Sequence, residues 1–108
     1  MNSQDIQELV QQELRKLREL ENFHGITPDT IQQFLVDPFQ VLVHPDDGGE
    51  TSSRYMWIIL QECKEINQGY LIAYDPLLNQ FDVVEQLRDG SFLQVCGGPS
   101  FADALNGM

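Results

Sequence analysis

The second half of the chain alternates short apolar runs with turn sequences, and this pattern restricts the possible folds most strongly. Four such runs, each typical of a β-strand, are Tyr55–Cys63, Tyr70–Tyr74, Gln80–Leu87 and Ser91–Cys96. The connections between them are too short for the crossovers that join parallel strands. They contain the turn sequences Asp75-Pro76 and Asp89-Gly90. We therefore predict an antiparallel meander.

The run Tyr55–Cys63 carries apolar residues at both odd and even positions. A strand has this composition when both of its faces are covered, so this strand is predicted to be central. A fifth strand, Phe39–Val43, precedes it and places Phe39, Val41 and Val43 on one face.

The N-terminal residues Asn2–Glu21 are predicted to form one helix. Apolar residues recur there at spacings of three and four, at Ile6, Val10, Leu14, Leu17 and Leu20. The stripe spans only about two heptads, fewer than the three or four typical of a coiled coil. We therefore favour packing on the chain's own sheet. A homodimer formed through this helix is the alternative.

Two short helices complete the predicted α+β fold. Thr27-Pro28-Asp29 is typical of a helix start and predicts a helix to about Leu35. Ser100 is a suitable cap for a last helix, Phe101–Asn106. The 108 residues have the size of one domain. We divide it into a helical arm (1–36), a sheet of about five strands (39–96) and a C-terminal helix (100–107).

The chain is acidic, with 17 Asp and Glu residues against 6 Lys and Arg residues and a formal net charge of −11. This charge disfavours nucleic acids and anionic membranes as partners, because both require clustered basic residues. It favours a basic protein partner, or else serves solubility. The polar start Met1–Glu8 lacks an apolar signal region, and the apolar run Met56–Leu60 is too short for a membrane span. We expect a soluble cytoplasmic protein.

Cys63 and Cys96 each lie among apolar strand residues. We interpret them as two separate thiols in a reducing compartment, although a bridge between neighbouring strands is an alternative. Two cysteines are too few for a disulfide scaffold.

The polar loop His44–Ser53 is the strongest candidate site in the sequence. It places Asp46, Asp47 and Glu50 near His44 on a glycine-rich backbone. Carboxylates and an imidazole can bind a divalent cation, but their spacing does not match an EF-hand. Asp-Gly-Gly is also common in ordinary turns, so a solvated loop is favoured over a metal site.

Other combinations of reactive residues do not form a recognised catalytic or cofactor motif. His24 and His44 have no paired metal-ligand spacing. Gly97-Gly98-Pro99-Ser100 is not a nucleophile elbow or a phosphate loop, and we interpret it as a strand-to-helix turn. We therefore predict no catalytic residues, no metal and no cofactor.

The strand aromatics are predicted to form core rather than a nucleic-acid platform, because their neighbours are acidic. They are Tyr55, Trp57, Tyr70, Tyr74 and Phe81. Part of that face could bind a protein, and the residues predicted to contact a basic partner are Asp46, Asp47, Glu50, Asp75, Asp82 and Glu85.

From Tyr55 onward, the predicted meander, acidic surface and short C-terminal helix together resemble small bacterial immunity proteins, which neutralise toxins. The resemblance implies an inhibitor that binds a basic protein. Our leading hypothesis is a non-enzymatic protein-interaction module. The alternatives are a small-molecule- or metal-binding domain using the loop His44–Arg54, and an oligomeric structural protein.

Overall fold

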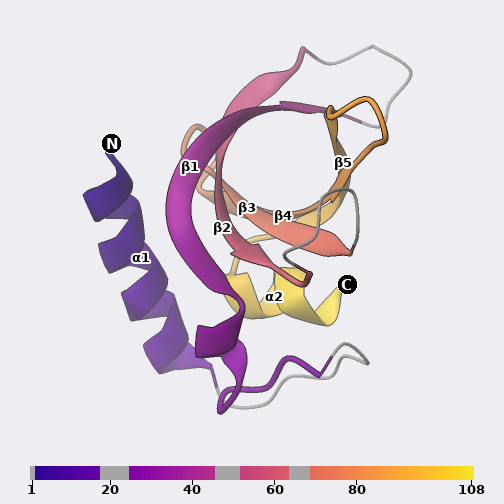
Figure 1. Cartoon of the computed structure of the whole chain (residues 1–108). Helices are drawn as coiled ribbons and strands as arrows, with labels where there is room; N and C mark the ends of the chain where they lie inside the picture. Colours follow the sequence, from indigo (N-terminus) through magenta and orange to yellow (C-terminus); the bar gives the residue numbers. More distant parts are fainter. Residues whose placement is uncertain (1, 18–24, 46–51, 64–68) are drawn as a thin grey trace.

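Five strands form a closed barrel with two helices packed outside it (Figure 1). The computed structural model describes residues 2–17, 25–45, 52–63 and 69–108. The strands are β1 (Leu35–His44), β2 (Arg54–Gln61), β3 (Tyr70–Asp75), β4 (Gln80–Gln86) and β5 (Phe92–Gly98). Each pairs antiparallel with the next along the chain. The predicted α+β class and meander are confirmed, and the bounds of β2 to β5 agree with the prediction to within two residues.

The barrel closes through a short parallel contact that the sequence analysis did not predict. Val43 pairs with Phe92, and His44 pairs with Leu93. Because each turn of the meander reverses the chain, the first and fifth strands of such a barrel run in the same direction.

Helix α1 (Ser3–Lys16) begins at a capping box. The side chain of Asn2 accepts a hydrogen bond from the Asp5 backbone, and the Asp5 carboxylate accepts one from the Asn2 backbone. The predicted extent to Glu21 is wrong, because Leu17 has an extended backbone and ends the helix. Leu20 lies outside the described residues. The apolar stripe packs on the barrel as expected, with Ile6 and Val10 buried.

The predicted helix Thr27–Leu35 is also wrong. Only one turn of 3-10 helix, η1 (Ile31–Gln33), forms there. Thr30 Oγ1 accepts a hydrogen bond from the Thr27 backbone and donates one to the Gly25 carbonyl oxygen. Such local bonds from threonine side chains compete with helix formation. The chain then enters β1 at Leu35, four residues before the predicted start of this strand.

The C-terminal helix α2 (Phe101–Asn106) forms as predicted. The Ser100 hydroxyl accepts a hydrogen bond from the Asp103 backbone at 3.1 Å. Phe101 and Leu105 are buried against the barrel. The predicted turn Gly97–Ser100 is shorter than expected, because Gly97 and Gly98 belong to β5 and only Pro99 and Ser100 connect that strand to this helix.

Alternate residues of the strands fill two separate cores. The outer core lies between barrel and helices and includes Trp57, Ile59 and Phe101. The inner core fills the barrel and includes Met56 and Ile58. Strand β2 therefore has two buried faces, which confirms the prediction that it is central. Among the described residues, none of the helices has the length and apolar composition to cross a membrane.

Candidate functional site

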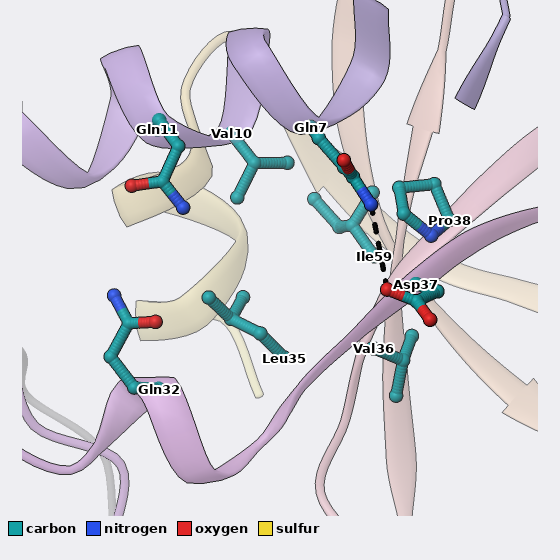
Figure 2. Close-up of a pocket in the computed structure, with 9 residues that line it drawn as sticks. All are labelled: Gln7, Val10, Gln11, Gln32, Leu35, Val36, Asp37, Pro38 and Ile59. Atoms are coloured by element: carbon teal, nitrogen blue, oxygen red, sulfur yellow. Dashed lines mark hydrogen bonds between the residues drawn. The ribbon is translucent and has the colours of Figure 1, made fainter. Parts of the chain in front are cut away.

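A groove between α1 and β1 combines polar side chains with an apolar floor (Figure 2). We call it the α1–β1 groove, and it has a volume of about 210 Å³. Its lining residues are Gln7, Val10 and Gln11 of α1, Gln32 of η1, Leu35, Val36, Asp37 and Pro38 of β1, and Ile59 of β2.

A bulge in β1 creates this groove. Leu35 pairs with Leu60 and Phe39 pairs with Ile58, so Val36, Asp37 and Pro38 lie opposite the single residue Ile59. The extra residues cannot all join the ladder, and bulges commonly redirect side chains in this way. Pro38 fits such a position because it has no N–H group to donate to a neighbouring strand.

Three side-chain amides and one carboxylate surround the groove. Gln7 Nε2 donates a long hydrogen bond of 3.4 Å to Asp37 Oδ1. Gln11 and Gln32 point toward each other from α1 and η1 (Figure 2). An amide can donate and accept at once, as a peptide backbone does. The groove can therefore bind peptide groups through its amides and a cation through Asp37.

The size of the groove decides between classes of ligand. Pockets for drug-sized molecules have volumes of roughly 300–1,000 Å³. The α1–β1 groove, at about 210 Å³, is smaller. It has room for one or two side chains of a partner, with apolar contact at Val10, Leu35 and Ile59.

A second pocket, of about 290 Å³, lies between α1 and β4, and three of its polar side chains have partners in the protein. The buried Glu13 accepts a hydrogen bond from the Phe101 backbone at 3.4 Å through Oε1. Its Oε2 lies 3.0 Å from Lys16 Nζ. On the opposite wall, Asn79 Oδ1 accepts a 2.6 Å hydrogen bond from the hydroxyl of Tyr74. The bond from Phe101 connects α1 to α2, and these contacts occupy Glu13, Lys16 and Asn79.

Two predicted partner-binding residues, Asp75 and Asp82, are fully buried and do not belong to an acidic surface. Their positions on β3 and β4 direct both side chains into the barrel. Asp75 Oδ1 accepts hydrogen bonds from the backbones of Leu77 and Leu78, at 2.9 and 3.4 Å. It therefore closes the β3–β4 turn.

The environment of Asp82 is less favourable to a charge. Burial raises the pKa of its carboxyl group, and the Asp75 carboxylate raises it further. The 2.7 Å hydrogen bond from Gln80 Nε2 to Oδ1 acts in the opposite direction, as does the charge of Arg54. Asp82 Oδ2 is buried without a hydrogen-bond partner in the described part of the chain.

The remaining predicted partner residues divide into two groups. Glu85 is exposed on β4, opposite Tyr70 and Leu93 of its neighbouring strands. Asp46, Asp47 and Glu50 lie outside the described residues, as does His24.

At the ends of the loop, His44 Nδ1 lies 2.5 Å from Ser53 Oγ. Within the ranges that the structure describes, no three His, Cys, Asp or Glu residues are grouped to hold a metal ion. Cys63 and Cys96 are not joined by a disulfide, so that alternative is wrong.

The predicted core role of the aromatics holds for three of them. Trp57, Tyr74 and Phe81 are buried and follow one another across β2, β3 and β4. The Tyr74 and Phe81 ring centroids are 5.0 Å apart. Tyr55 is 65% exposed, so it is a surface residue.

Sequence reasoning missed the α1–β1 groove. The available signal was Asp37-Pro38, because proline next to a strand often marks a bulge. In comparisons with protein-family models, curated proteins and solved structures, the chain matched none of them.

Proposed function

We propose that this protein is a non-enzymatic interaction module that binds a basic segment of a partner protein in the α1–β1 groove. The observation that carries the proposal is the position of Asp37, which the β1 bulge directs toward the amides of α1. Among the described residues that line the groove, Asp37 is the only charged one. An incoming Lys or Arg side chain would find its counter-charge there.

The floor of the groove fits the stem of such a side chain. Lysine and arginine bury their methylene chains on apolar surface while the charged head stays near water. Val10 and Ile59 offer that surface, and Gln7, Gln11 and Gln32 offer donors and acceptors to the neighbouring peptide groups.

The net charge of −11 would attract a basic partner and speed its association. No disulfide joins Cys63 and Cys96, and a reducing compartment preserves this state. We therefore propose a cytoplasmic location for the protein and its partner.

The test is an NMR titration with short peptides that are identical except for one central residue, Lys, Arg or Glu. We expect the Lys and Arg peptides to shift the side-chain amide signals of Gln7, Gln11 and Gln32, and the Glu peptide to leave them unchanged. Asp37→Asn should weaken binding of the basic peptides about 1.4- to fivefold, because an exposed ion pair contributes about 0.2–1 kcal/mol.

Asp29→Asn is the matched control, since Asp29 is exposed and does not line the groove. It removes the same charge, so it should change the affinity only as much as the loss of one unit of net charge does. Equal weakening by both substitutions, or equal binding of the Glu peptide, would refute the proposal.

A further inference from the structure

One edge of β1 is unpaired along most of its length. Of its 10 residues, only Val43 and His44 pair with β5, so eight residues, Leu35–Leu42, face no described strand on that side. Figure 1 shows β1 as a long arc along one rim of the barrel, with α1 on its outer side. The barrel closes through these two residue pairs only, and an edge that stays open is a template for another strand.

Within this edge, the bulge with Asp37 and Pro38 is of a kind that hinders pairing, but the part from Phe39 to Leu42 lacks such protection. Natural edge strands often carry lysine or another charge along the open side. Between Phe39 and Leu42 the described strand has no charged residue. Phe39 is 40% exposed and Leu42 is 39% exposed, and they belong to opposite faces of the strand. An added strand would therefore cover an apolar side chain on each of its two faces.

We infer that the free edge of β1 binds an extended segment of the basic partner as an added β-strand. This inference rests on the proposed function and specifies its geometry. Asp37 is two residues from Phe39 on the same strand, so the groove and the free edge are continuous. A segment that alternates basic and apolar residues can contact both.

The acidic net charge of the protein favours a basic segment over a second copy of the chain as the partner of this edge. A second copy of this chain would bring another net charge of −11 and another Asp37 to the same strand. Like charges placed together at an interface oppose association. A segment with lysine or arginine at alternate positions instead complements Asp37 and the acidic molecule around it.

The probe is a capped peptide of about seven residues in which lysine alternates with valine, long enough to cover the edge at about 3.3 Å per residue. Two further peptides carry backbone N-methyl groups at all odd or all even positions, which blocks one edge of the peptide at a time. We expect one methylation pattern to abolish binding and the other to preserve it. We also expect β1 amides not bonded to β2 to gain protection from hydrogen exchange.

Leu42→Lys should weaken binding about tenfold or more, because it places a like charge beside the added strand. Val95→Lys is the matched control. Val95 is an apolar residue on β5 that is 45% exposed, so its substitution adds the same charge at a similarly exposed position. It should alter the affinity less than twofold.

Equal binding of both methylated peptides, with equal effects of the two lysine substitutions, would overturn this inference. If Asp37→Asn still weakened binding more than Asp29→Asn did, the proposed function would be retained without this inference. If none of the basic peptides bound, both the proposed function and this inference would be refuted. If the unliganded protein formed a dimer and Leu42→Lys abolished that dimer, the partner of this edge would be a second copy of the chain and not a basic segment.

Discussion

The Nε atom of Arg54 lies 3.3 Å from Oδ2 of Asp75 inside the barrel. The two atoms form an ion pair, although their alignment is not that of a hydrogen bond. Asp75 is fully buried, whereas the Arg54 side chain is 26% exposed. Arg54 also acts on Asp82, so one cation serves two buried carboxyl groups. Two buried carboxyl groups that share one cation lower the stability of the folded protein, and substitutions can measure this effect.

Arg54→Met should destabilise the protein by about 3 kcal/mol. Removing one partner of a buried pair leaves the other charge uncompensated, at a cost of about 3–5 kcal/mol. We expect the lower end, because water reaches part of Arg54 and screens the interaction. Urea unfolding measures the change. Arg88→Met, at an exposed position, should change stability by about 0.5 kcal/mol or less.

Asp82→Asn should stabilise the protein relative to wild type as the pH rises. The folded protein raises the pKa of Asp82 above its ordinary value of 3.8. Between the unfolded and folded pKa values the native state holds more protons, so this group lowers the stability of the wild type with increasing pH. Above the folded pKa the penalty is constant. The asparagine side chain of the variant carries no charge and escapes this penalty.

Unfolding of the two proteins across a pH series measures this difference. The gain from Asp82→Asn should be smallest near pH 3.8, increase toward the folded pKa and then level off. Asp89→Asn controls for the loss of a negative charge. The folded pKa of Asp89 is lowered, first by the hydrogen bond from the Ser91 hydroxyl, so its replacement should cost stability above that pKa. A pH-independent difference for Asp82→Asn would contradict the account.

Gly97→Ala should destabilise the protein by about 1–3 kcal/mol, the usual cost of overpacking. A methyl group at Gly97 would overlap Asp82 Oδ1 and contact Gln80 Nε2. The Asp82→Ala background removes the obstructing carboxylate, so the same substitution should cost less there. A double-mutant cycle measured by thermal unfolding gives the coupling between the two sites. Additive effects would show that the carboxylate does not occupy this space.

The fold followed from the sequence wherever the signals were local. Asp89-Gly90 and Asp75-Pro76 marked real turns, and Ser100 caps the last helix as expected. Barrel closure did not follow, because Val43 and Phe92 are distant in sequence and no periodic pattern connects them. The error at Asp82 has the same origin. From the sequence we predict Asp82 at a partner-binding surface, but barrel closure turns its face of β4 into the interior.

The candidate site could not be predicted from the sequence, because it depends on tertiary packing that the spacing of apolar residues does not indicate. Asp37 reaches α1 only because β1 begins at Leu35 and bulges before Phe39. Propensity instead favoured a helix through this segment. The hydrogen bonds between Thr27, Thr30 and Gly25, together with the pairing of Leu35 with Leu60, overrode that preference.

The most direct test of the central claim is the contact between a bound lysine side chain and the floor of the α1–β1 groove. Methyl-labelled protein saturated with the lysine peptide should show intermolecular nuclear Overhauser effects from the lysine methylenes to Val10 and Ile59. Asp37→Asn should reduce these signals at equal peptide concentration, and Asp29→Asn should preserve them. Effects confined to methyl groups outside the groove, such as those of the exposed Leu77, would contradict the claim.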